Sequence, residues 1–144
     1  MEVKQIDPKD TYPIRHAVLR QGLPIETCHF EGDGDEFTFH LGAFIQDRLA
    51  SVASFYLKSN DKYLEPYQFQ LRGMATLTEF QKQGLSAALL QMAFPIIKRN
   101  HVKLLWCNAR VAAVGFYEKM GFVQDSDVFE IEGVGPHVLM HKVI

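Results

Sequence analysis

The sequence has few of the features that mark membrane, secreted or nucleic-acid-binding proteins. No apolar run reaches the ~20 residues that a membrane-spanning helix needs, and the segment from Met1 to Gln5 does not resemble a signal peptide. The two cysteines, Cys28 and Cys107, are too few for a disulfide framework. Basic residues number 15 against 17 acidic ones, so there is no basic excess that would favour nucleic acid. We therefore expect a cytoplasmic protein whose partners include neither a nucleic acid nor a membrane.

The common phosphate and metal motifs are also missing. The patterns G-x-x-x-x-G-K-S/T and G-x-G-x-x-G do not occur. The acidic segment Glu31–Glu36 has carboxylates at alternate positions, but it lacks the D-x-D/N-x-D/N-G pattern of a calcium loop. His137 and His141 lie four residues apart on a predicted strand, ~13 Å at ~3.3 Å per residue, which is too far for one zinc ion. Cys28 and His29 are adjacent in the sequence, but adjacency alone is weak support for a nucleophile–base pair and covalent catalysis. We expect no metal.

The chain has the length and composition of a single soluble domain spanning residues 1–144. It has 144 residues, of which 47% are hydrophobic and 22% charged. Alternating or continuous apolar residues predict seven strands, at Val3–Ile6, Phe37–Ile45, Leu49–Leu57, Tyr67–Leu77, Val102–Cys107, Phe122–Ile131 and His137–Val143. Gly73, in the middle of the fourth strand, predicts a β-bulge or a close backbone contact.

Three helices are predicted between these strands. The first is capped by Thr11 and ends before Gly22, and the second begins at about Leu85, with a bend or an end where Pro95 lies. The third, Ala109–Met120, is capped by Asn108. Hairpins followed by a β-α-β crossover indicate an α/β (α+β) fold with a mixed sheet and helices on both faces.

The segment that joins the fourth strand to the second helix is a candidate anion site. A strand, a short loop with Gly84 and a helix beginning there aim unpaired backbone N–H groups at one point. The helix dipole adds roughly half a positive charge at that end. Many such turns bind nothing, so this feature alone is a weak signal.

Two strings in the chain resemble motifs of the GNAT N-acetyltransferase superfamily. The string Gln81-Lys82-Gln83-Gly84-Leu85-Ser86 resembles its coenzyme A pyrophosphate loop, Q/R-x-x-G-x-G/A, with Ser86 in place of Gly or Ala. Asn108-Ala109-Arg110 followed by Val114–Phe122 is similar to the motif N-A-x…A-x-x-F-Y-x-K-x-G-F, with Gly115 as the departure. The chain therefore resembles a small, single-domain bacterial member of this superfamily.

The resemblance implies a fold, a co-substrate and a set of site residues. The fold is that of acyl-CoA N-acyltransferases, whose mixed sheet is splayed between the fourth and fifth strands, with acetyl-CoA bound there. Tyr117 would protonate the departing thiolate, and a backbone N–H near Met74 would hold the thioester carbonyl. The implied coenzyme contacts are Met74, Ala75, Thr76, Gln81, Lys82, Gln83, Gly84, Leu85, Ser86, Asn108 and Phe116. Without the motif, Tyr117 would be a core aromatic, and Asn108 a helix cap.

The acceptor site has to be sought in the strand pattern, because the resemblance assigns it no residue. Gln68, Gln70 and Arg72 share one face of the fourth strand, where a central strand should be apolar. One interpretation is structural, with a carboxylate of the segment Gln21–Glu36 pairing Arg72. The other is that Gln70 and Arg72 line an acceptor cleft roofed by that segment and by the turn Gly133–His137.

Three functions follow from these features. The leading hypothesis is an acetyl-CoA-dependent N-acetyltransferase, monomer or homodimer, that moves the acetyl group directly to a primary amine of a small molecule or peptide. The alternatives are a non-catalytic acyl-CoA-binding or sensing domain and a plain interaction domain. His137, which also borders the cleft, and Glu26 are the candidate general bases, and an ordered water that carries the proton is the alternative.

Overall fold

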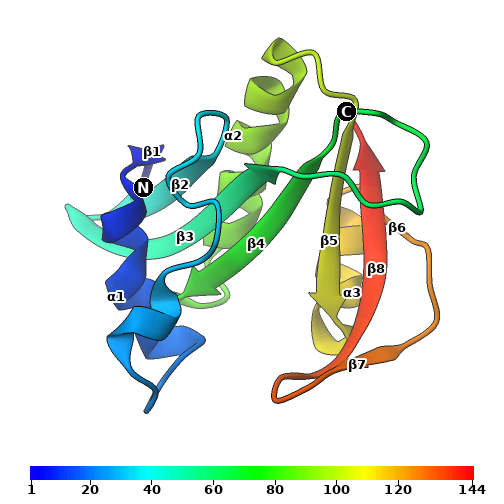
Figure 1. Ribbon diagram of the computed structural model, residues 1–144. Helices are drawn as coiled ribbons and strands as arrows, with labels where there is room; N and C mark the ends of the chain where they lie inside the picture. The colour runs from blue at the N-terminus through cyan, green and yellow to red at the C-terminus, as the bar shows by residue number, and fades with distance from the viewer.

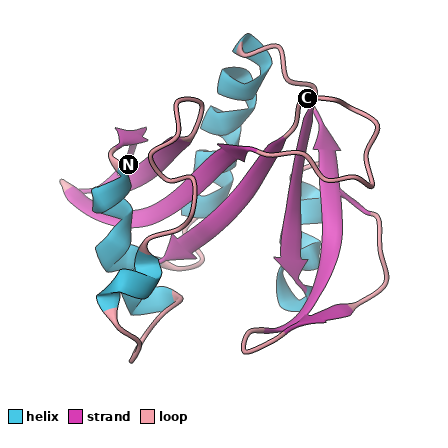
Figure 2. Ribbon diagram, in the orientation of Figure 1, coloured by secondary structure: helices cyan, strands magenta, loops and turns pink.

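The computed structural model describes residues 1–144 and contains one eight-stranded mixed sheet (Figures 1 and 2). The strands are β1 Glu2–Ile6, β2 Phe39–Ile45, β3 Arg48–Leu57, β4 Phe69–Thr76, β5 Leu104–Arg110, β6 Val123–Gln124, β7 Phe129–Ile131 and β8 Gly135–Val143. Their order is β1-β2-β3-β4-β5-β8-β6, with β7 also paired to β8. Only β4 and β5 run parallel, because α2 carries the chain between them. The predicted mixed sheet is confirmed.

Helices cover both faces of this sheet, as predicted. The helices are α1 Pro8–Val18, α2 Leu85–Arg99 and α3 Val114–Lys119. In Figure 1, α1 lies on one face of β3 and β4, while α2 and α3 lie on the other. The largest core cluster fills the space between the sheet and α2, around Phe55, Leu89 and Leu105, which are fully buried. None of the three helices has the length and apolarity needed to cross a bilayer.

The sheet splits between β4 and β5. These two strands pair only at Phe69 with Leu105 and at Gln70 with Trp106, and then diverge toward their carboxyl ends (Figure 1). The predicted bulge is present three residues beyond Gln70, where Gly73 has φ +65° and the β3–β4 register shifts. A bulge increases local twist, so it turns β4 away from β5 at this point. The backbone edge of β4 beyond the bulge is therefore free of a strand partner on the β5 side.

Three predicted boundaries were wrong. Helix α1 begins at Pro8, not after Thr11, because Asp10 accepts a hydrogen bond from the N–H of Asp7 at 3.0 Å and closes the first turn. Asn108 does not cap a helix: it lies within β5, opposite Leu139 of β8. The third helix starts only at Val114.

The third correction concerns one predicted strand. The predicted strand Phe122–Ile131 is two short strands, β6 and β7, each pairing with a different part of β8. Of the two outcomes predicted at Pro95, a bend or an end of the helix, the end is excluded, because α2 continues to Arg99. The proline removes one N–H from the hydrogen bonds of the helix.

Candidate functional site

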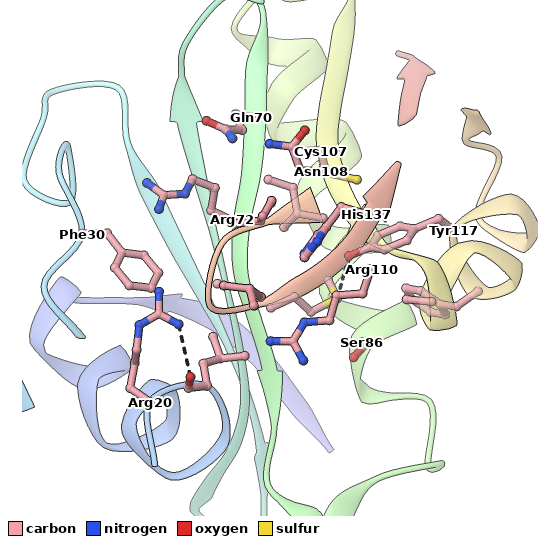
Figure 3. A pocket seen from close by; sticks show the side chains of 18 residues that line it. Arg20, Phe30, Gln70, Arg72, Ser86, Cys107, Asn108, Arg110, Tyr117 and His137 are labelled. Atoms are coloured by element: carbon pink, nitrogen blue, oxygen red, sulfur yellow. Dashed lines mark hydrogen bonds between the residues drawn. The ribbon is translucent and has the colours of Figure 1, made fainter. Parts of the chain in front are cut away.

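A cavity of about 520 Å³ occupies the split between β4 and β5 (Figure 3). Its walls come from β4, β5, α3, the end of α1, the loop that holds Phe30, and the turn between β7 and β8. A second cavity of about 400 Å³ continues along β4 to the start of α2. The two cavities share Leu19, Met74, Ser86, Arg110 and Phe116, so they form one groove.

Most of the predicted coenzyme contacts line this groove. Those in the second cavity are Met74, Ala75, Thr76, Gln81, Lys82, Gly84, Leu85, Ser86 and Phe116. Asn108 lines the first cavity. Gln83 lines neither, and its side-chain amide instead approaches the carbonyl of Glu79 at 3.5 Å.

The start of α2 has the geometry of an anion site. Gly84 is the N-cap residue with φ +80°, and a Cβ built there would have no heavy atom within 4 Å. The first N–H of the helix to find a helical partner is that of Ala88, which donates to the carbonyl of Gly84 at 3.1 Å. The N–H groups of the first turn are therefore available to a ligand that approaches Gly84 closely.

Ser86 stands where the family motif has a smaller residue, and it has a structural use. Its Oγ lies 3.3 Å from the Oγ1 of Thr76, which is itself 2.7 Å from the Oγ of Ser51. Gln81 adds a hydrogen bond from Nε2 to the carbonyl of Thr76 at 3.2 Å. These contacts tie the loop and the first turn of α2 to β4, which keeps the anion site in line with the split.

Tyr117 reaches the groove from α3. Its hydroxyl donates to the sulfur of Met74 at 3.9 Å, and its ring packs against Phe116 and Phe122 at 5.2 Å between centroids. Only 8% of the residue is exposed, and this burial raises its pKa above the ordinary tyrosine value. The phenol is therefore protonated at neutral pH and can donate a proton into the groove. The ring of Tyr117 therefore packs in the core while its hydroxyl lies at the cavity wall.

The three predicted acceptor residues line the first cavity together. Gln70 is 6% exposed and His137 is 5% exposed, whereas Arg72 is half-buried. The Nδ1 of His137 lies 2.8 Å from the carbonyl of Gly135, which can only accept, so the neutral ring is protonated at Nδ1 and keeps a lone pair on Nε2. Glu26, the other candidate base, does not line the groove.

The predicted carboxylate partner of Arg72 is wrong, because the buried carboxylate of that loop pairs with another arginine. Arg15 is fully buried and donates to both carboxylate oxygens of Asp33, at 2.7 and 3.0 Å. Tyr56 donates to the same carboxylate at 2.6 Å. Burial alone would raise the pKa of Asp33, but hydrogen bonds from Arg15, Tyr56 and the Phe30 N–H outweigh it and lower the pKa. This network fixes the loop and places the Phe30 ring against Gly73.

Neither cysteine offers a nucleophile. Cys107 lines the cavity, but burial raises its pKa to about 12, so it is a thiol at neutral pH. Cys28 is fully buried away from the groove, and the ring of His29 stacks on Tyr12 at 4.2 Å. No group of three or more His, Cys, Asp or Glu side chains is placed to bind a metal ion.

Among the cavity residues that the sequence analysis missed, Arg20, Phe30 and Arg110 bear on the charge of the cavity. Arg110 belongs to the second motif string and could have been singled out there. Arg20 and Phe30 carry no local signal, because they reach the cavity only through the packing of α1 and its following loop on β4.

The comparisons with known proteins agree with this geometry. The family model described as Acetyltransferase (GNAT) domain matches residues 27–144. The uncharacterised N-acetyltransferase YitI of Bacillus subtilis is 39% identical over 144 residues, which cover 100% of this chain and 97% of the relative.

Two solved structures share the fold at low identity. An aminoglycoside 6'-N-acetyltransferase complexed with coenzyme A aligns with a TM-score of 0.77 at 11% identity, over 99% of this chain and 97% of the other. The ribosomal-protein-alanine N-acetyltransferase of Brucella melitensis aligns with a TM-score of 0.77 at 13% identity, over 100% of both chains. With the family match, the YitI relative and the split mixed sheet taken together, the chain belongs to the GNAT family and is an N-acetyltransferase.

Proposed function

We propose that the protein transfers an acetyl group from acetyl-CoA directly to a primary amine of a small molecule or peptide. The observation that carries this proposal is the meeting of two cavities at Met74, beneath the buried hydroxyl of Tyr117. One cavity ends at the anion site of α2, and the other is lined by Gln70, Arg72 and His137. A two-substrate transfer needs such a junction, with a donor groove on one side and an acceptor cavity on the other.

The donor groove fits coenzyme A by the chemistry of its lining. The N–H groups after Gly84 suit a pyrophosphate, and exposed Lys82 adds a positive charge beside them. The unpaired edge of β4 from Gly73 to Thr76 suits the amide groups of a pantetheine arm. When bound there, the coenzyme supplies an activated thioester.

Three groups of this chain would then act on the reaction. The backbone N–H near Met74 polarises the thioester carbonyl as the amine nitrogen forms its bond to the acetyl carbon. Tyr117 gives its hydroxyl proton to the sulfur when the carbon–sulfur bond breaks. The Nε2 of His137 accepts the proton that the amine nitrogen loses, and proton exchange with solvent restores both side chains.

The proposal also covers the cellular compartment and the oligomeric state of the protein. Both cysteines are free thiols, which is compatible with a reducing cytoplasm. Residues 1–144 act as one catalytic domain, either as a monomer or as a homodimer.

Calorimetric titration and an amine screen together test this function. Acetyl-CoA and CoA should both bind the protein, and coenzyme A thiol should be released over a panel of primary amines. If acetyl-CoA does not bind, the donor groove is wrongly assigned. If it binds and no amine accelerates thiol release, a coenzyme-sensing role replaces the transferase.

A further inference from the structure

The acceptor end of the cavity gathers positive charge that the chain does not neutralise. Arg20, Arg72 and Arg110 line the first cavity, and no aspartate or glutamate does. Arg20 and Arg72 lie on the same aromatic ring, with guanidinium carbons 5.3 and 4.8 Å from the Phe30 centroid (Figure 3).

We propose that Arg72, Arg20 and Gln70 form an anion subsite, and that the acceptor carries a carboxylate or phosphate on the same molecule as its amine. This inference rests on the proposed acetyl transfer, since it names the acceptor class of that same cavity. It adds to that function the residues that bind the acceptor and the requirement that the acceptor carry an anionic group. Neither is contained in the two motifs.

The first support is the contrast among the arginines. Buried Arg15 is paired with Asp33, and surface Arg48 with Glu79. Arg72 is half-buried between the rings of Phe30 and Tyr56, yet its guanidinium makes no ion pair. Its donors are held in place by the two rings and have no acceptor in the chain. The N–H donors of a planar guanidinium group have the geometry to form two parallel hydrogen bonds to a carboxylate or phosphate.

The second support is the contrast between two glutamines two residues apart, Gln68 directly before β4 and Gln70 within it. Both ends of the Gln68 amide are used, since Oε1 accepts from the N–H of Asn60 at 2.8 Å and Nε2 donates to the carbonyl of Glu65 at 2.8 Å. Gln70 is almost as deeply buried, but its Oε1 has no partner. A buried amide without a partner is costly, so a ligand in the cavity is its natural partner. Because the amide can rotate, it can donate to an anion or accept from an N–H.

The third support concerns the reacting amine. Unpaired guanidinium groups lower the pKa of a nearby amine, which favours the neutral, nucleophilic form. The same charges repel an ammonium ion that arrives from solvent, unless the molecule also carries an anion that they attract. An acceptor with both groups resolves this conflict, with the anion at Arg72 and the amine toward Met74 and His137.

A neighbouring cavity presents the competing possibility. It measures about 340 Å³, also touches Gln70 and Arg72, and is lined by the acids Glu31, Asp35 and Glu36. These carboxylates would suit a second ammonium group, which would make the acceptor a diamine. They lie outside the cavity that contains Tyr117 and His137, so we favour the anionic acceptor and make the diamine an arm of the test.

The experiment compares amines of matched length on wild type and variants. The probes are 5-aminopentanoate, pentylamine and 1,5-diaminopentane, with aminoethyl phosphate against ethanolamine to separate phosphate from carboxylate. The variants are Arg72→Gln and Arg20→Gln, with Arg99→Gln on the exposed side of α2 as the matched control. We expect wild-type kcat/KM to be at least about tenfold higher for an anionic probe than for its neutral counterpart.

Arg72→Gln should remove this preference. We expect kcat/KM for the anionic probe to fall roughly 10- to 100-fold and kcat/KM for pentylamine to change much less, with acetyl-CoA affinity unchanged, because charge-assisted hydrogen bonds are lost only with the anion. Arg99→Gln should behave as wild type. Calorimetric titration of unreactive glutarate and methyl phosphate into the protein gives a readout that does not depend on transfer.

The outcomes separate this inference from the function on which it rests. A preference for the diamine, an Arg72→Gln variant that loses neutral and anionic probes equally, or no detectable binding of either anion overturns the subsite. Failure of acetyl-CoA to bind, with Arg72-dependent anion binding intact, overturns the transferase proposal and keeps the subsite.

Discussion

The hydroxyl of Tyr117 donates to the sulfur of Met74 at 3.9 Å, joining α3 to β4 across the split in the sheet. The two strands that flank the split pair with each other only further back, at Phe69 with Leu105 and at Gln70 with Trp106. The proposed proton donor therefore lies directly over the strand that would hold the thioester. This placement makes the role of the hydroxyl testable apart from the role of the ring.

Replacing Tyr117 by phenylalanine should lower kcat and leave acetyl-CoA affinity unchanged. The ring keeps its packing against Phe116 and Phe122, and only the proton for the thiolate is lost. General acid catalysis is worth about 10²–10⁴-fold, so we expect a loss of at least about tenfold on a verified acceptor. Tyr67→Phe, at a residue that is 67% exposed, is the control. Wild-type turnover in Tyr117→Phe would mean that the residue only packs.

Gly84→Val should abolish acetyl-CoA binding in a protein that still folds. A branched side chain at the N-cap obstructs the approach of a phosphate to the first turn of α2. Gly22 provides a closely matched control, since it has the same φ of +80° and the same open space around a built Cβ. Gly22→Val should therefore suffer a similar backbone strain but bind acetyl-CoA normally, as measured by calorimetry. Equal affinities in the two variants would remove the pyrophosphate assignment.

Asp33→Asn should destabilise the fold by about 3–5 kcal/mol, because it leaves the charge of Arg15 buried without a counter-charge. Urea denaturation measures the loss. The control is Glu79→Gln, which breaks the exposed pair with Arg48 and should leave stability unchanged. A small loss in Asp33→Asn would show that Tyr56 and the Cys28 carbonyl are sufficient partners for Arg15.

Acidification should weaken the fold through His40. Burial lowers the pKa of this residue below the ordinary histidine value, so the unfolded chain takes up a proton at a higher pH than the folded one. Stability therefore falls as the pH drops through about 6.5, the ordinary value, toward the lower folded pKa. His40→Gln should flatten the dependence of the free energy of unfolding on pH between about 7.5 and 5.

The control for this pH effect is His101→Asn, at an exposed residue with φ 60° that asparagine tolerates. It should keep the wild-type slope of unfolding free energy against pH. An unchanged slope in His40→Gln would assign the acid sensitivity to other groups.

The sequence by itself determined the parts of the site that are local in the chain. These parts are Gly73, the loop from Gln81 to Ser86 and the Phe116-Tyr117 pair. The structural effect of each one involves residues that are close to it in the sequence. Gly73 within a strand predicted the bulge, and the strand–loop–helix pattern predicted a helix N-terminus that could bind an anion, whereas the place of Tyr117 at the groove was implied by the resemblance to the GNAT motif. Alternation of apolar residues predicted the strands, since a strand shows its faces in its own pattern, and the order of hairpins and crossover predicted the mixed sheet.

Only the tertiary structure decided the helix boundary after Asn108 and the partners of the charged groups. Asn108 favours caps in isolation, but pairing with Leu139 of β8 keeps it in a strand. Asp33 pairs with Arg15 rather than Arg72, because packing of α1 buries the Arg15 guanidinium beside this carboxylate. Contacts between residues this distant in sequence leave no local periodicity, so the charge of the acceptor cavity could be read only from the folded chain.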